Sequence, residues 1–263
     1  MSTDTHETTE TTTDEYGPDD GLLVLDHVTK RFGGLTAVDD LSFVVEEGEI
    51  LGFIGPNGAG KSTTFNCVVG RLPPTSGTVY YDGEDVTGSA VHEMVKRGLA
   101  RTFQEFRPLE DRSIRANVAL ALTPDKLFSM QGLSGATKRR AAELCERVGL
   151  GDRMEMSPGE LPHAGLLRLE LARALATDPE LLLVDEPFAG LSGPEVESIS
   201  KLLLELRDEG RTLVVVDHNM RGLLSLIDRG IVIQFGSMIA EGSPEAIRND
   251  PDVQEAYLGG GDI

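Results

Sequence analysis

The feature that most constrains this chain is a glycine-rich run, Gly55-Pro56-Asn57-Gly58-Ala59-Gly60-Lys61-Ser62-Thr63. It lies between an apolar stretch, 50–54, that is typical of a buried strand, and a stretch, 61–70, that is typical of a helix. Glycines let successive backbone N–H groups converge, and the start of a helix favours anions. The run therefore predicts a phosphate-binding loop, in which Lys61 reaches the β- and γ-phosphates and the Ser62 hydroxyl binds Mg²⁺.

Strand-like and helix-like stretches alternate along most of the chain. The strand-like stretches are Leu22–Val28, Leu41–Val45, Ile50–Ile54, Gly77–Tyr81, Ala100–Phe103, Glu180–Val184, Thr212–Val216 and Gly230–Gln234. The helix-like stretches are Lys61–Gly70, Lys138–Val148, Leu166–Leu175, Pro194–Arg207, Pro244–Asn249 and Pro251–Leu258. This alternation predicts an α/β fold with a parallel sheet. Because 113–175 contains no strand-like stretch, we expect a helical subdomain, at about 105–175, inserted into that core.

Two carboxylates follow a second apolar strand. The stretch 181–184 is Leu-Leu-Leu-Val, and Asp185, Glu186 and Pro187 come directly after it. Ligands of open α/β sheets bind at the carboxyl ends of the strands, so we expect both acids beside the glycine-rich loop. Asp185 is placed to hold Mg²⁺, and Glu186 to orient or deprotonate an attacking water. The alternative is that both acids only cap the turn at Pro187.

His218 stands after a third strand-like stretch, which ends at Val216 and Asp217. At that sheet edge it could hydrogen-bond the γ-phosphate of a nucleotide held by the neighbouring loop. A single histidine after a strand is more often structural. The residues alone leave both interpretations open.

The chain is strongly acidic, with a formal net charge of −20. Residues 1–20 hold seven acids and no base, so we expect a disordered acidic tail followed by one domain over 21–260. The remainder is also acidic, which argues against a nucleic-acid partner. Because the 24 bases include only six lysines, we expect a halophile-like protein adapted to a salty cytoplasm. An ordinary acidic protein is the alternative.

The cysteines indicate a reducing compartment, and the hydropathy pattern bears on whether the chain enters a membrane. Cys67 and Cys145 are the only cysteines, and neither has a partner at metal-ligand spacing. We expect both to be free thiols. The sequence shows neither an apolar run of about 18 residues, as a membrane helix needs, nor a secretory signal. A membrane, if one is involved, would be supplied by a partner.

In their order, these motifs resemble those of the ATP-binding subunits of ABC transporters, and the resemblance covers nearly all of 21–260. It implies ATP and Mg²⁺ as ligands. It also implies a P-loop NTPase core whose mainly parallel sheet is joined by an antiparallel part near the N-terminus. Gln104 matches the glutamine that approaches Mg²⁺ and the attacking water. Phe32 matches the aromatic that stacks on adenine, Val38 is a further ATP-binding residue, and His218 matches the switch histidine.

The resemblance thus implies three sets of site residues. The catalytic residues are Glu186, His218 and Gln104. The metal-binding residues are Ser62, Gln104 and Asp185. The ATP-binding residues are Phe32, Val38 and Gly55 to Thr63.

One stretch, Leu161-Pro162-His163-Ala164-Gly165, departs from the family pattern, which has Leu-Ser-Gly-Gly-Gln before a helix. Pro162 replaces the serine and removes an N–H group. Ala164 replaces the glycine whose N–H approaches a γ-phosphate. In the family this signature closes on the ATP of the opposite subunit, so the site that it completes is expected to be weak or silent. Ser192 likewise stands where an aspartate is expected after Glu186.

Within the family, Asp185–Leu191 and Glu241–Gly259 resemble the ATPases of branched-chain, or hydrophobic, amino-acid uptake. ATPases of lipopolysaccharide export and urea uptake are near relatives, so the substrate is inferred by analogy. The resemblance implies a second ATPase subunit in a hetero- or homodimer, two membrane permease subunits and, indirectly, an extracellular substrate-binding protein. It places the chain at the cytoplasmic face of the membrane.

Two alternatives of another class stay open. The first is a regulatory subunit that binds ATP without hydrolysing it, which the degenerate signature would suit and the retained Glu186 argues against. The second is an ABC ATPase of translation or DNA repair. Such proteins usually carry two cassettes or a long coiled-coil insert, which 263 residues do not accommodate.

Overall fold

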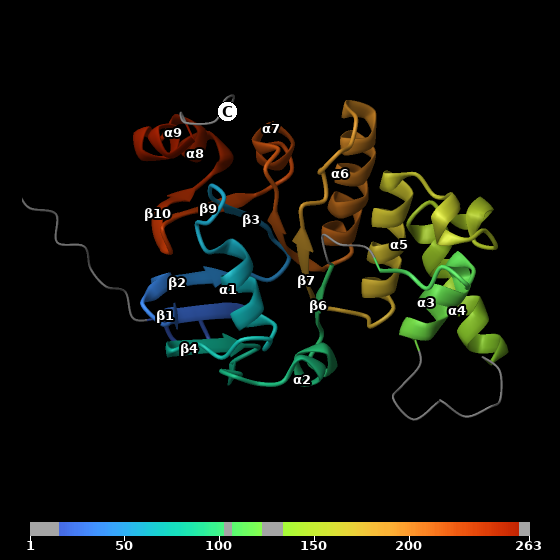
Figure 1. The fold of residues 1–263 in the computed structure, drawn as a ribbon, viewed down its shortest axis with the longest axis horizontal. Coiled ribbons are helices and arrows are strands. Elements are labelled where there is room, and N and C mark those ends of the chain that lie inside the picture. The colour runs from blue at the N-terminus through green and yellow to red at the C-terminus, as the bar shows by residue number, and fades with distance from the viewer. Residues whose placement is uncertain (1–15, 103–106, 123–133, 258–263) are drawn as a thin grey trace, which may run out of the picture.

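The computed structural model describes residues 16–102, 107–122 and 134–257, and these residues form two sheets with helices around them (Figure 1). The first sheet is antiparallel and has the order β2-β1-β4-β5. Its strands are β1 (Leu23–Phe32), β2 (Leu35–Val45), β4 (Ser76–Tyr81) and β5 (Glu84–Asp85). The antiparallel part expected near the N-terminus is confirmed.

The second sheet has the order β10-β9-β3-β8-β7-β6. Its strands are β3 (Ile50–Ile54), β6 (Leu99–Arg101), β7 (Leu181–Asp185), β8 (Thr212–Val216), β9 (Arg229–Gln234) and β10 (Ser237–Gly242). Neighbouring strands run parallel except for β10, which is antiparallel to β9. The central strands are apolar along their length because both faces of the sheet are covered. The predicted P-loop NTPase fold is confirmed.

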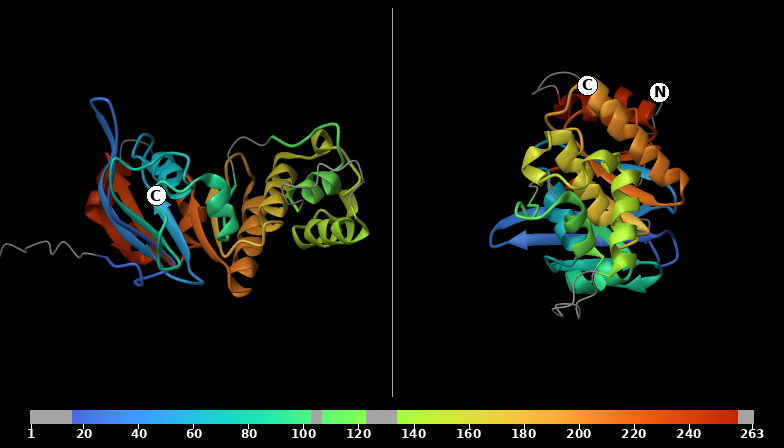
Figure 2. Two further views of the ribbon diagram at one scale, coloured as in Figure 1. Left: turned by 90° about the horizontal axis from the view of Figure 1, so that it is seen from below. Right: turned by 90° about the vertical axis from the view of Figure 1, so that its right-hand side faces the viewer.

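Helices cover the second sheet and extend to one side of it. They are α1 (Lys61–Val68), α2 (Val91–Lys96), α3 (Ile114–Ala121), α4 (Gly135–Arg147), α5 (His163–Leu175), α6 (Gly193–Asp208), α7 (Met220–Leu224), α8 (Pro244–Asn249) and α9 (Pro251–Tyr257). The helices α3, α4 and α5 lie together beyond α6, away from the first sheet (Figures 1 and 2). They fall between β6 and β7 in the chain, where the helical insertion is expected. Its limits as a subdomain remain a prediction.

Aromatic side chains join the first sheet to the second through α1. Side chains alternate along β3, so Leu51 and Phe53 face the core that α1 and the first sheet share. The Phe53 ring lies 5.4 Å from the Phe43 ring of β2 and 6.0 Å from the Phe65 ring of α1, centroid to centroid. The start of α1 is therefore held by both sheets.

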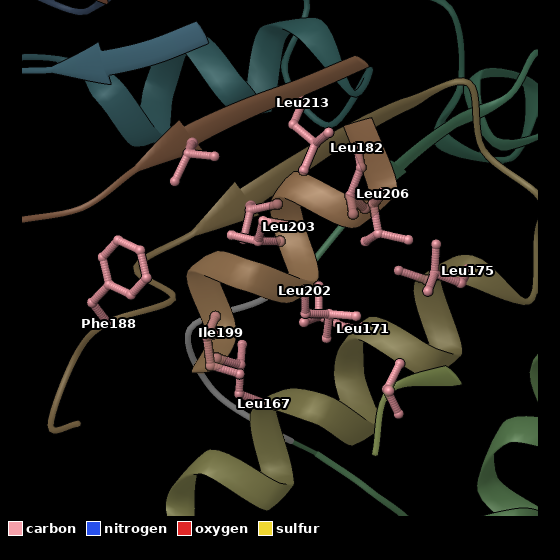
Figure 3. Packing of buried hydrophobic residues seen from close by; sticks show 14 of the residues in the cluster. Leu167, Leu171, Leu175, Leu182, Phe188, Ile199, Leu202, Leu203, Leu206 and Leu213 are labelled. Atoms are coloured by element: carbon pink, nitrogen blue, oxygen red, sulfur yellow. The ribbon is translucent and has the colours of Figure 1, made fainter. Parts of the chain in front are cut away.

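The opposite face of the second sheet packs on α6, and α6 packs on α5 (Figure 3). Apolar residues at helix spacing give α6 two contact faces. Leu203 faces the sheet, and Ile199 and Leu202 face α5. This packing fixes the start of α5 relative to the carboxyl end of β7.

Several sequence predictions were incomplete. The strands expected at 22–28 and 41–45 are longer, because polar residues continue both strands to a tight turn at Gly33, whose φ is +58°. Strand β10 and the short helices α2 and α7 were not predicted, because they are short and only partly apolar.

Residues 1–15 of the expected tail, Phe103 and Leu258 lie outside the described residues. No described helix is both long and apolar enough to cross a membrane.

Candidate functional site

The glycine-rich loop connects β3 to α1 with a backbone that only glycine adopts readily. Gly58 and Gly60 have φ values of +82° and +109°, and Gly60 is the N-cap of α1. A Cβ on Gly60 would collide with the Ala37 carbonyl, and one on Gly55 would lie 2.5 Å from the Ile233 carbonyl oxygen. The turn at Gly236 braces the loop, because its N–H donates to the Ala59 carbonyl at 2.9 Å. The loop is thus a preformed anion cradle at a helix N-terminus.

Lys61 places a buried positive charge inside this cradle. Its Nζ donates to the Gly55 carbonyl, and to the Pro56 carbonyl at 2.9 Å. Burial lowers the pKa of Lys61, and the nearby charges of Glu186 and Asp185 counteract that shift. The ammonium group is therefore desolvated and held near the carboxylates, as a phosphate-binding lysine requires.

Asp185 ends β7 and is paired with an arginine that sequence analysis missed. The Arg101 guanidinium lies 2.7 Å from Asp185 Oδ2 and donates to Asn66 Oδ1 of α1 at 2.9 Å. Both side chains of the ion pair are nearly buried. Arg101 ends β6, which neighbours β7, and only that adjacency could have identified it. Asp185 and Ser62 line one cavity, so two of the three predicted magnesium ligands share a space.

Glu186 and His218 meet although 31 residues separate them in the chain. The strands β7 and β8 are parallel neighbours, so the residues that follow them emerge side by side. His218 Nε2 lies 3.0 Å from Glu186 Oε1. Glu186 has a φ of +50°, in the left-handed region that a non-glycine residue rarely adopts. Such strain is concentrated at functional sites.

Asp217, which sequence analysis did not assign, is 3% exposed beneath this pair. Its Oδ2 accepts the Phe188 N–H at 2.6 Å, and its Oδ1 accepts the Asn219 N–H at 2.7 Å. Burial raises the pKa of Asp217, while these two hydrogen bonds lower it. Only its position before His218 distinguished it in the sequence.

The predicted adenine contacts differ in exposure. Phe32 ends β1 and is 46% exposed, with the Lys30 ammonium 5.3 Å from its ring centroid. Its free face suits stacking on a base. Val38 is fully buried in the core shared with α1 and does not reach the surface beside Phe32. Gln104 lies outside the described residues. The roles of Val38 and Gln104 stay predictions.

The signature stretch lies at the start of α5. Pro162 is the N-cap, and no side chain caps this helix. Pro162 and His163 are exposed, Ala164 is half-buried, and Leu161 and Gly165 are buried. The helix therefore presents an exposed N-terminus that lacks the serine hydroxyl and glycine of the family pattern.

Comparisons with known proteins agree with this geometry. The family model described as ABC transporter matches residues 38–189, and that of the branched-chain amino acid ATP-binding cassette transporter matches 237–263. The branched-chain amino acid transport ATP-binding protein BraF of Pseudomonas aeruginosa is 38% identical over 251 residues, which are 90% of this chain and 98% of BraF. LivG of Escherichia coli, a high-affinity branched-chain amino acid transport ATP-binding protein, is 35% identical over 249 residues, with the same coverages.

Two further matches bear on the breadth of the family. The lipopolysaccharide export system ATP-binding protein LptB of Escherichia coli is 35% identical over 238 residues, which are 90% of this chain and 97% of LptB. The ADP conformation of MJ1267, an ATP-binding cassette of an ABC transporter, superposes with a TM-score of 0.82 at 30% identity, over 90% of this chain and 98% of that one. The chain belongs to the ABC transporter family, as an ATP-binding subunit related to the branched-chain amino acid ATPases.

Proposed function

We propose that this chain is the ATP-hydrolysing subunit of an importer of branched-chain or other hydrophobic amino acids. The observation that carries hydrolysis is the Glu186–His218 contact of 3.0 Å at the sheet edge that also presents Asp185. The substrate is supported by the match of 237–263 to the branched-chain family model and by the names of BraF and LivG. Urea import is the alternative substrate that the sequence suggested.

The nucleotide would be held at two places. Phe32 stacks on the adenine ring, and Gly55 to Thr63 cradle the phosphates, which Lys61 of the same run neutralises. The cradle fits this role because side chains larger than hydrogen are excluded at Gly55 and Gly60. Of the ATP-binding set predicted from sequence, Phe32 and Gly55 to Thr63 are proposed to hold the nucleotide, whereas the contact predicted for Val38, which is fully buried, stays a prediction.

The residues present also fit Mg²⁺. Ser62 and Asp185 supply two oxygen ligands to one cavity, and Gln104 is the third proposed ligand. Within the described ranges no three His, Cys, Asp or Glu side chains converge as metal ligands, so most of the ion's remaining ligands would be phosphate oxygens and water. When bound, the ion neutralises charge that develops on the transferred phosphoryl group.

Glu186 and His218 would carry the chemistry of this chain. The Glu186 carboxylate accepts a proton from the attacking water, whose oxygen forms the new bond to the γ-phosphorus. The bond between that phosphorus and the oxygen that bridges it to the β-phosphate breaks, and ADP leaves with the electron pair of that bond. The His218 imidazole, which contacts Glu186 from β8, orients that carboxylate and hydrogen-bonds the γ-phosphate. Gln104 is expected to position the same water.

The partner permease would dock at the same cavity, of about 760 Å³, that Ser62 and Asp185 also line. Four arginines and several apolar side chains line it: Arg71, Arg101, Arg107, Arg173, Val91 and Met94. Two acids line it as well, and they pair with two of the arginines, Asp185 with Arg101 and Glu170 with Arg173. The lining therefore has two more bases than acids, and in a chain with a net charge of −20 this excess suits an acidic, partly apolar helix. Two permease subunits would hold the ATPase at the cytoplasmic face of the membrane.

The second ATPase subunit would be a different chain. Pro162 and Ala164 remove a hydroxyl and a glycine from the surface that completes the opposite site. A partner with an intact signature would complete the site at Lys61, whereas this chain would complete its partner's site poorly. The assembly would therefore contain one strong and one weak ATPase site.

The test is ATP turnover by the purified chain in molar salt, alone and co-expressed with the permease and second ATPase encoded beside it. We expect turnover to appear or rise sharply only in the assembly. If ATP binds but no turnover appears in either case, the chain is instead a binding-only regulatory subunit, which the signature substitutions would explain. Full activity without molar salt would contradict the halophile-like interpretation.

A further inference from the structure

The loops that carry Glu186 and His218 are joined through a third side chain, that of Asp217. Its two carboxylate oxygens accept one N–H from each loop, from Phe188 at 2.6 Å and from Asn219 at 2.7 Å. Asp217 and Phe188 are each 3% exposed, so water does not compete for the bond between them, whereas the bond to Asn219 is partly buried. A buried carboxylate with two short main-chain bonds is a strong and directional tie.

The loop after β7 needs such a tie because its backbone is strained. Glu186 has a φ of +50° and precedes Pro187, and a residue before proline is restricted to extended conformations. The Glu186 N–H donates to the Val216 carbonyl at 2.7 Å, which anchors one end of the segment to β8. The Phe188–Asp217 bond anchors the other end. Glu186 is thus fixed on both sides in a conformation that it would not adopt alone.

The loop after β8 is fixed by the same residue. Asn219 caps α7 by accepting the Gly222 N–H at 2.9 Å, and its own N–H is held by Asp217. The Phe188 ring, which faces the core in Figure 3, lies against Gly222, where a Cβ would be 3.2 Å from Phe188 Cδ2. His218 lies between the two residues that this network fixes, Asp217 and Asn219.

From this geometry we propose that Asp217 is a positioning residue for hydrolysis, which makes the Glu186 loop and the His218 loop one rigid unit. It does not touch the reacting atoms. It sets the distance between the base and the histidine, and it keeps Glu186 in its strained conformation. The inference rests on the proposed roles of Glu186 and His218. Its test distinguishes a failure of the inference about Asp217 from a failure of the proposed function.

The first measurement is hydrogen exchange of the whole chain, followed by mass spectrometry. In Asp217→Ala, we expect exchange in peptides covering 186–190 and 217–222 to be at least about tenfold faster, since one buried and one partly buried hydrogen bond are lost. Asp217→Asn retains one acceptor and should lie between Asp217→Ala and the unmodified chain. Unchanged exchange in both segments of Asp217→Ala would overturn the proposal, whatever the role of Glu186.

The second measurement compares kcat with the Kd of ATP in the transporter assembly. Displacement of a reacting group by about 1 Å can cost about a hundredfold in rate, so Asp217→Ala should lower kcat by about tenfold to a hundredfold. The Kd of ATP should not change, because the glycine-rich loop is untouched. Partial recovery of kcat in Asp217→Asn would support positioning.

The matched control is Asp228→Asn. The Asp228 carboxylate also accepts a main-chain N–H, that of Ile50 at 2.8 Å, but at the amino end of β3, opposite the site. It should leave kcat and the exchange of both loops unchanged. An equal loss of kcat in Asp217→Asn and Asp228→Asn would overturn the proposal. Retained turnover in Glu186→Gln would contradict the proposed function instead, while the exchange measurement would still test the Asp217 tie.

Discussion

Two helices of this chain begin where the family places phosphate, and they begin in opposite ways. Helix α1 starts after Gly60, in a backbone that excludes any larger residue, with Lys61 folded into the cradle. Helix α5 starts after Pro162, without a capping side chain, and carries His163 and Ala164 in its first turn. In the proposed function, the chain therefore has full chemistry for its own nucleotide and reduced chemistry for the nucleotide of a partner. The two nucleotide sites of a pair need not be equally active.

The largest effect expected from this difference is on turnover. Glu186→Gln should lower kcat by about a hundredfold or more, because a general base contributes about that much. ATP binding should persist, since the cradle around Lys61 is intact. Turnover of radiolabelled ATP and a binding titration measure the two quantities.

A matched control for that variant lies beside α5. Glu160 precedes the signature stretch, and its carboxylate accepts the Ser157 N–H at 2.8 Å. Glu160→Gln should leave kcat unchanged. Equal effects of both substitutions would contradict the assignment of Glu186 as the general base of this chain's own site.

The next effect is on nucleotide affinity. Lys61→Gln should raise the Kd of ATP about tenfold to a hundredfold, because a hydrogen bond to a charged group contributes about 1.5–3 kcal/mol. Titration with a fluorescent ATP analogue measures this. Arg168→Gln is the comparison in α5, where a partly buried guanidinium donates to Ser198 Oγ at 2.7 Å. Arg168→Gln should alter the free energy of unfolding but not the Kd of ATP. A large change in the Kd would contradict the assignment of ATP binding to α1 and not to α5.

Stability should distinguish the two helix starts through their glycines. Gly60→Ala should lower the free energy of unfolding by about 2–3 kcal/mol, since alanine is strained at a φ of +109° and meets the Ala37 carbonyl. Gly165→Ala should change it by less than about 1 kcal/mol. There the gain in helix propensity opposes a contact of 3.1 Å with Leu161 Cβ. Urea denaturation of both variants measures the free energy of unfolding. Similar losses of this free energy in Gly60→Ala and Gly165→Ala would contradict the expected difference between the two helix starts.

The smallest effect is expected from restoring the signature. The double substitution Pro162→Ser and Ala164→Gly should raise turnover of the assembly about twofold to tenfold, because one regained hydrogen bond contributes about 0.5–1.5 kcal/mol. The ATP affinity of the isolated chain should stay the same. An unchanged rate in the assembly would show that the degenerate signature does not limit it.

Sequence analysis was most successful where chemistry and backbone geometry coincide. The run at 55–63 was predictable because its glycines are required by positive φ values and close contacts. Asp185 and Glu186 were predictable because a fully apolar strand ends in two acids. The buried strands β7 and β8 were located to within one residue because each is an apolar run bounded by polar residues.

What could not be predicted depends on contacts between distant segments. Arg101 is 84 residues from Asp185, and nothing near it in the chain marks it as an ion-pair partner. In the sequence Asp217 is only the neighbour of His218, because its hydrogen-bond partner Phe188 is 29 residues away in the chain. The length of β1 and β2 was underestimated because their pairing, not their hydrophobicity, continues the strands to the turn at Gly33.

The shared aromatic packing of Phe43, Phe53 and Phe65 determines how small a functional cassette of this kind can be. The antiparallel sheet is not detachable, because its β2 strand supplies one of the three rings and β1 and β2 precede the loop that they support. A truncated chain that kept only the parallel sheet would expose the apolar face of β3 and leave α1 supported on one side. A functional cassette therefore includes β1 and β2, together with Leu22, which is 3% exposed in the same core, and all of these lie well upstream of the proposed phosphate-binding motif.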